Sequence, residues 1–276
     1  MNRIPEPVYE KDVATLVRYF RRAMDDIEAE LMRMDLSDFR RANALAVQAQ
    51  IREILKDLDA NITAWASTTF PKAAQEGVAR SIVSLGVAET FSEAMKLVKF
   101  NELNKSLIEL AIADTQADLL QVTQNIDRKT RNAIRQAMAD VMRENMAQGV
   151  NGVRSIRRDF LAEARRQLGD SINTGIIDAS NRRWKPTDYA DMVTRTKLHT
   201  TYREAARNDA IDRGALYGVI SSHGATDACR NWEGRVVKFV PDAPGPYPYI
   251  GDLPRREIFH PRCRHHVSPI RRPDLA

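Results

Sequence analysis

The chain has few cysteines, and this scarcity excludes a secreted protein held together by several disulfides. Two cysteines in 276 residues are too few for such a framework, so thiols or metal ligands are their expected roles. A single disulfide between Cys229 and Cys263 remains an alternative if the protein finally lies outside the cell.

Long hydrophobic runs are also missing. The sequence has no run of about 18 apolar residues, and its first residues contain neither an apolar signal core nor a small-residue cleavage site. We therefore expect a protein that is made and kept in a cytoplasm and has no membrane partner. Apolar residues still make up 43% of the chain, which is enough for a sizeable buried core.

Motifs for catalysis are absent as well. No glycine-rich phosphate loop occurs, and no serine, histidine or cysteine stands in a recognisable nucleophile context. No repeat of fixed period is found, which argues against a solenoid. We predict no catalytic residues and no enzymatic activity.

Apolar residues at three-four spacing predict long amphipathic helices over 13–34 and 45–65. The dipeptide Phe70-Pro71 is expected to separate the second helix from the next one or to kink it. Further helices are predicted over 72–85, 91–102, 105–123, 127–148, 152–169 and 187–213.

After Gly214 the sequence changes character. Short β-rich runs over 216–221, 235–240, 258–259 and 266–267 surround a connection rich in proline and glycine. The predicted fold class is mainly α: an elongated helical body with long amphipathic helices, followed by a small β-rich C-terminal module. The predicted division is a helical body over 1–184, a connecting helix over 185–214 and the module over 215–276.

This module holds both cysteines and four of the five histidines of the chain. Thiolate and imidazole are the usual ligands of structural zinc, and a short, loop-rich segment needs such a cross-link. On a strand, Cys263 and His265 would point to the same side and His266 away from them. The sequence therefore predicts a zinc site made of His223, Cys229, Cys263 and either His260 or His265. A metal-free cluster of buried thiols and hydrogen-bonded histidines is the main alternative.

The middle of the chain is basic. Residues 128–166 contain ten Lys or Arg against four Asp or Glu, whereas the net charge of the whole chain is only +5. Such a surface can contact phosphates or dock on an acidic partner, although an ordinary solvated helix face has the same composition. The candidate residues for contact with nucleic acid or with an acidic partner protein are Arg128, Arg131, Arg135, Arg143, Arg154, Arg157 and Arg158.

An ordered set of motifs runs over residues 180–270 and comprises Trp184 with Tyr189, Arg195-Thr196, Tyr202-Arg203, Val219 to His223, Cys229-x-x-Trp232-x-Gly234 and His260-Pro261-x-Cys263-Arg264-His265. This set resembles the minor capsid or head-morphogenesis proteins of tailed bacteriophages, in particular the Mu F-like minor head proteins. Two residues depart from the pattern. Lys197 stands where many relatives have an acidic residue, and Trp232 stands near a position where some have another cysteine, which makes histidine ligation more important.

The resemblance implies a structural virion protein present in few copies at the portal vertex or the inner capsid surface, acting in head assembly or DNA delivery. The implied partners are the portal protein, the major capsid protein and packaged double-stranded DNA, with assembly in the host cytoplasm. Two other functions stay open at this point. One is a zinc-dependent nucleic-acid-binding module, and the other is a metallonuclease in which Asp227 or Glu233 assists paired histidines.

Overall fold

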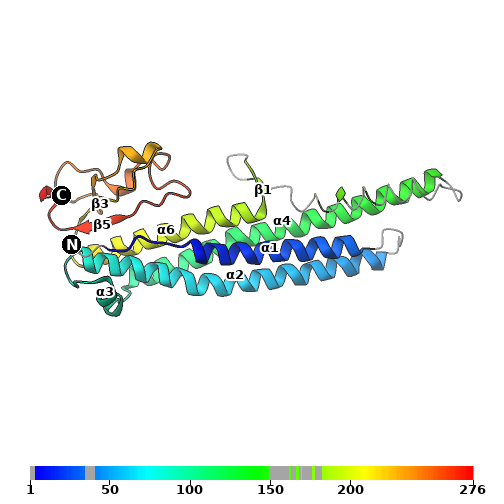
Figure 1. Cartoon of the computed structure of the whole chain (residues 1–276), viewed down its shortest axis with the longest axis horizontal. Helices are drawn as coiled ribbons and strands as arrows, with labels where there is room; N and C mark the ends of the chain where they lie inside the picture. The colour runs from blue at the N-terminus through cyan, green and yellow to red at the C-terminus, as the bar shows by residue number, and fades with distance from the viewer. Residues whose placement is uncertain are drawn as a thin grey trace. The chain divides into compact units, whose positions relative to one another are not determined.

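The computed structural model describes residues 4–34, 41–148 and 182–275, together with residues 162, 166, 167, 169, 176 and 177. Helices dominate this part of the chain, and a small β-rich module follows them, so the predicted mainly α fold is confirmed (Figure 1). The described helices are α1 (Glu10–Arg33), α2 (Arg41–Ser84), α3 (Phe91–Leu97), α4 (Glu102–Gln148) and α6 (Pro186–Asp212).

The chain divides into two compact units. The first consists of residues 1–13, 65–115 and 192–276, and the second of residues 14–64 and 116–191. Helices α1, α2, α4 and α6 contribute residues to both units. The division into body, connecting helix and module at residues 184 and 214 stays a prediction.

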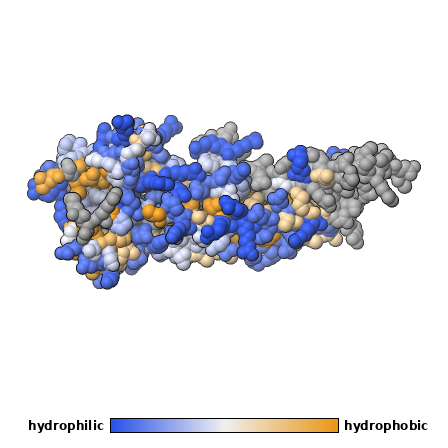
Figure 2. All heavy atoms as spheres, in the orientation of Figure 1, coloured by the Kyte–Doolittle hydropathy of each residue, from blue (hydrophilic) through white to orange (hydrophobic). Residues whose placement is uncertain are grey.

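The three-four spacing of apolar residues is reflected in the burial of each helix. In the second unit the buried side chains include Phe20 and Ile27 of α1, Leu55 and Ile62 of α2, and Ile126 of α4. Charged residues occupy the remaining helix faces, and the surface seen in Figure 2 is largely hydrophilic. None of the described helices is long and apolar enough to span a membrane.

Two helix boundaries differ from the sequence-based prediction. Helix α2 continues through Pro71, and α4 is one helix where two were expected over 105–123 and 127–148. A proline inside a helix removes one backbone hydrogen bond, but the fully buried Phe70 and Ala73 on either side anchor the helix in the core. Helix α3 is shorter than predicted, and the helix expected over 152–169 lies outside the described residues except at a few positions.

Gly214 ends α6 as predicted. Its φ of +73° is the left-handed conformation that glycine adopts without strain, and the N–H of Ala215 donates to Ala210 O at 2.8 Å. A three-stranded antiparallel sheet of order β4-β3-β5 follows. Its strands are β3 (Tyr217–Ile220), β4 (Val236–Lys238) and β5 (Val267–Ile270), and a further pair is formed by β1 (Ile176–Ile177) and β2 (Arg183–Trp184).

The C-terminal module has its own apolar core, which the end of α6 completes. Val237 of β4 and Phe239 pack in one cluster with Ala210 of α6, and both cysteines belong to the same cluster. Both cysteines are therefore buried at the edge of an apolar core.

Gly77 lies where the backbones of α2 and α6 pack closely within the first unit. A Cβ atom at this position would overlap the Tyr202 carbonyl oxygen and would lie 3.2 Å from the Ala206 backbone nitrogen. Gly77→Ala is expected to destabilise the protein by about 1–3 kcal/mol, because overpacking outweighs the better helix propensity of alanine. The measurement is the midpoint of denaturant unfolding. Asn61→Ala, at an exposed position of the same helix, should leave the midpoint nearly unchanged, and equal effects of the two changes would contradict the close contact.

Candidate metal centre

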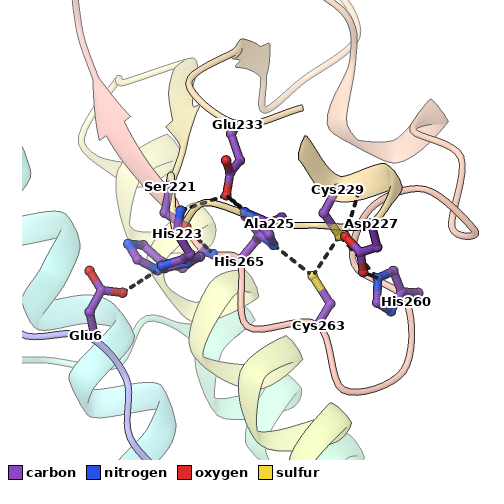
Figure 3. Close-up of polar contacts among 11 residues, drawn as sticks. Glu6, Ser221, His223, Ala225, Asp227, Cys229, Glu233, His260, Cys263 and His265 are labelled. Atoms are coloured by element: carbon purple, nitrogen blue, oxygen red, sulfur yellow. Dashed lines mark hydrogen bonds and ion pairs between the residues drawn. The ribbon is translucent and has the colours of Figure 1, made fainter. Parts of the chain in front are cut away.

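Cys229 is positioned by a short 3-10 helix, η1 (Ala228–Asn231), that follows β3. The Asp227 side chain caps this helix by accepting a hydrogen bond from the Cys229 N–H at 3.0 Å. This cap fixes the first turn, and the thiol of Cys229 is buried within the module (Figure 3).

Cys263 is positioned by a tight turn in the other limb of the module. The N–H of Cys263 donates to His260 O at 2.9 Å, and Phe259 and Arg262 both have positive φ angles of 58° and 67°. The strand predicted at Ile258-Phe259 is not formed. Both side chains are buried in the module core, so these β-forming residues fill the core from a turn instead of a strand.

The structure brings Cys229, His260 and Cys263 together, with one ligand atom of each within 4.8 Å of the others, and His265 contacts this group through Cys263. Cys229 Sγ lies 3.8 Å from Cys263 Sγ and 3.1 Å from His260 Nε2, and Cys263 Sγ lies 3.3 Å from His265 Nδ1. The two cysteines are free, so the alternative of a disulfide is not realised. Ligands in tetrahedral zinc sites are about 3.8 Å apart between two sulfurs and about 3.5 Å apart between sulfur and nitrogen. The observed separations are close to these values.

The hydrogen bond at Nδ1 of His260 leaves its Nε2 available as a metal ligand. Its Nδ1 lies 3.0 Å from Pro261 O, which can only accept, so Nδ1 carries the proton of the neutral imidazole. The lone pair of Nε2 then faces Cys229 Sγ and also Asp227 Oδ2, 3.2 Å away. A carboxylate and an imidazole lone pair repel each other unless a cation or a proton lies between them.

His265 is oriented in the same way by Glu233. The Glu233 carboxylate accepts hydrogen bonds from the N–H groups of His223 at 2.7 Å and Ala225 at 3.1 Å. These bonds, the first above all, lower the pKa of Glu233 to about 2, so the group is ionised. His265 Nε2, 3.0 Å from Glu233 Oε1, therefore donates. The contact with Cys263 and the bond to Glu233 raise the pKa of His265, so its Nδ1 can donate to the Cys263 thiolate until a metal ion replaces that proton. Ligand histidines commonly have such a carboxylate partner.

The two thiols differ in their tendency to ionise. Burial raises the pKa of Cys229, and the neighbouring Cys263 raises it further. Burial also raises the pKa of Cys263, but the contacts with His265 outweigh that effect and lower it to about 7. One thiolate is therefore accessible near neutral pH, and a bound metal ion would deprotonate both sulfurs.

His223 lies apart from the sulfur atoms. Its Nε2 is 2.8 Å from Ser221 Oγ, and its ring lies edge-on to that of His265 with 4.8 Å between centroids. Its ligand atom instead groups with those of Glu6 and His266. The prediction that His265, unlike His266, points towards Cys263 agrees with these contacts, although β5 begins only at Val267.

The cluster borders an open cavity of about 420 Å³. Its walls come from the segment before α1, the loop after β3 and the turn around Cys263, and they include Glu6, His223, Asp227 and His260. Sequence reasoning considered Asp227 and Glu233 only as helpers of a nuclease, and it did not identify Glu6. No local pattern marks Glu6, because it lies more than 200 residues from the histidines that it approaches.

The predicted basic residues of α4 lie on its solvent side. Arg128, Arg131, Arg135 and Arg143 are exposed, whereas Ile134 and other apolar residues between them are buried. Two of these cations are paired on their own helix: Arg131 lies 2.9 Å from Asp127, and Arg143 lies 2.9 Å from Asp140. Arg154, Arg157 and Arg158 lie outside the described residues.

Comparison with known proteins agrees with the resemblance drawn from the motifs. The model of the family phage minor capsid protein 2 matches residues 27–270, a range that includes the long helices and the Cys/His cluster. No curated protein and no solved structure matches the chain. Because the family match spans most of the sequence, the chain belongs to the phage minor capsid protein 2 family and is a structural component of a phage virion.

Proposed function

We propose that this minor capsid protein is held at the portal vertex or the inner capsid surface, where it acts in head assembly or DNA delivery. It would bind the portal protein or the major capsid protein, and its role is structural, without catalysis. The observation that carries the proposal is the family match, because it includes both the helical portion and the C-terminal module.

An apolar stripe on α4 offers a surface for a protein partner. Leu103 and Leu110 are 61% and 64% exposed, and Leu107 lies between them at helical spacing. Leu107 and Leu110 also border a groove of about 270 Å³ whose other wall is formed by Lys197 and Thr200 of α6. Exposed apolar residues gathered on one face of a charged protein are typical of protein contact sites.

The exposed arginines of α4 support a secondary contact with packaged DNA. Arg128 and Arg135 are exposed and form no ion pair with an acidic side chain of the described residues, whereas Arg131 and Arg143 are each neutralised in part by an aspartate. A contact with phosphates through so few cations is weak and depends on salt concentration. The proposed location therefore depends mainly on contacts with portal or capsid protein, and the contact with DNA is secondary.

A structural zinc ion is part of the proposal. Cys229, His260 and Cys263 would hold it, and His265, which contacts Cys263, would become the fourth ligand after a shift of its ring, so that no position stays open for a reacting water. The ion would cross-link η1 to the turn before β5, two segments that lie on either side of the proline-rich connection. The residues fit this role because both histidines place a ring nitrogen next to a sulfur atom, at 3.1 Å for His260 and 3.3 Å for His265.

Incorporation into heads tests the proposed location. In cells that make this chain with the portal and major capsid proteins of its phage, we expect the chain to sediment with heads in far fewer copies than the major capsid protein. The double variant Leu103→Asp/Leu110→Asp should lower its incorporation at least about tenfold, because two apolar contacts are lost. Met142→Asp, at another exposed apolar position of α4, is the matched control and should be incorporated normally.

The same preparation distinguishes protein contact from DNA contact. Heads without packaged DNA should retain the chain if it binds portal or capsid protein. The double variant Arg128→Gln/Arg135→Gln should lower retention only in DNA-filled heads. A chain that stays soluble while complete heads form without it would refute the proposed location.

A further inference from the structure

A second cluster of metal-ligating groups lies beside the Cys/His cluster and shares no residue with it. Glu6, His223 and His266 each offer one ligand atom, and these atoms all lie within 4.8 Å of one another. They come from three separate segments: the residues before α1, the loop after β3, and the residue before β5. Figure 3 shows the Glu6 carboxylate directed towards the histidine rings.

His266 is the buried centre of this cluster. Its side chain is only 3% exposed, and its Nδ1 atom makes no hydrogen bond although Glu6 Oε2 lies 3.2 Å away. The backbone holds the residue in place, because its N–H donates to Ser221 Oγ at 3.1 Å and its carbonyl accepts from the Ser221 N–H at 2.9 Å. A buried nitrogen that lacks a hydrogen bond costs free energy, and unless it is protonated its lone pair faces the Glu6 carboxylate unfavourably. A cation bound between the two groups would remove both costs.

The other two ligands can move to meet a cation. Glu6 is about half exposed, with 50% of its side-chain surface accessible, and His223 is exposed. Nitrogen and oxygen ligands of tetrahedral zinc are about 3.3 Å apart, a separation that His266 Nδ1 and Glu6 Oε2 already have. The remaining separations need to shorten by no more than about 1.5 Å, which side-chain rotation can supply.

Two imidazoles and one carboxylate are the ligand set of a first-row divalent cation, zinc above all. Burial of the ring, and after it the neighbouring Arg80 cation, lowers the pKa of His266, and the charge of Glu6 opposes the effect of Arg80. Three protein ligands leave a further position for water. Glu6 and His223 border the cavity of about 420 Å³, so that water has a route to the ion.

We propose that Glu6, His223 and His266 bind a second divalent cation, which fastens the segment before α1 to the C-terminal module. That segment already has two anchors in the first unit. Pro5 O accepts a hydrogen bond from Arg80 Nη2 at 2.7 Å, and the buried Tyr9 ring meets the His199 ring edge-on at 5.2 Å. The cation adds a third anchor that can be removed and restored. Glu6 lies outside the residues matched by the family model, whereas His223 and His266 lie within them.

Metal titration of the full chain tests the site. The protein is stripped of metal and titrated with Co²⁺, whose absorption separates thiolate ligands from imidazole and carboxylate ligands. We expect two equivalents per chain, of which only one produces a thiolate-to-cobalt band. Glu6→Gln and His223→Gln should each lower the affinity for the second metal ion at least about tenfold and leave the thiolate band unchanged. Removing a direct ligand should lower the affinity by no less than removing a residue that hydrogen-bonds to a ligand.

Glu10→Gln is the matched control, since Glu10 borders the same cavity but does not belong to the cluster. It should keep both equivalents. Hydrogen exchange of residues 4–9 gives a second measurement: saturation with Zn²⁺ should slow it in the native chain and in Glu10→Gln, but not in Glu6→Gln. A single equivalent in the native chain, or two equivalents of unchanged affinity in Glu6→Gln, would overturn the proposal.

Discussion

Cys263→Ser is expected to release zinc from the protein and to unfold much of the C-terminal module. A serine hydroxyl is a poor substitute for a thiolate ligand, and binding of structural zinc contributes directly to the folding free energy of small modules. Cys263 is also buried in the module core beside Phe259. We expect the free energy of unfolding of the module to fall by more than about 3 kcal/mol. Elemental analysis and denaturant unfolding measure the two effects.

The histidines provide matched controls for this experiment. His260→Gln and His265→Gln should each lower zinc content, because both rings place a nitrogen next to a cysteine sulfur, at 3.1 Å and 3.3 Å. His223→Gln should retain the cysteine-bound zinc, because that ring lies with Glu6 and His266. A chelator should destabilise the native chain and have little effect on Cys263→Ser. Native protein that contains no stoichiometric metal would refute the zinc proposal.

Arg80→Leu is expected to destabilise the first unit by about 2–4 kcal/mol, because it leaves buried oxygen atoms without a donor. Arg80 is only 3% exposed. It donates to Tyr202 Oη, to Ser268 Oγ at 3.1 Å and to Pro5 O at 2.7 Å, so one side chain of α2 joins α6, β5 and the segment before α1. Burial raises the pKa of Tyr202 to about 12, which keeps this acceptor neutral.

Two further variants separate hydrogen bonding from charge. Arg80→Lys keeps the charge but cannot donate in three fixed directions, so an intermediate loss is expected. Arg128→Leu, at an exposed position of α4, should change stability by no more than about 0.5 kcal/mol. Thermal or denaturant unfolding measures all three. If Arg80→Leu were as stable as the native chain, the cost of burying the cation would equal the gain from its hydrogen bonds.

Much of the fold could be predicted from local sequence. The three-four spacing of apolar residues predicted α1, and the glycine at 214 predicted the end of α6, because both signals depend only on nearby residues. The continuation of α2 through Pro71 could not be predicted in this way. It depends on the burial of Phe70, which is a property of the packed helices.

The candidate site was also predicted from local sequence only in part. The crowding of cysteine and histidine after residue 220 was sufficient to predict a cluster and to name Cys229 and Cys263 within it. Its geometry was not predictable, because the positive φ of Phe259 replaces the expected strand by a turn that brings His260 to Cys229. The same packing separates His223 from the sulfur atoms.

Composition and periodicity were thus enough to establish a mainly helical chain with a Cys/His-rich module, because helices and ligand types are encoded over a few neighbouring residues. The partners of Glu6 and Arg80 depended on packing. Glu6 meets His266 from the opposite end of the chain, and Arg80 meets Tyr202 across 122 residues. Contacts over such separations arise only when whole helices and the sheet assemble, and no local pattern records them.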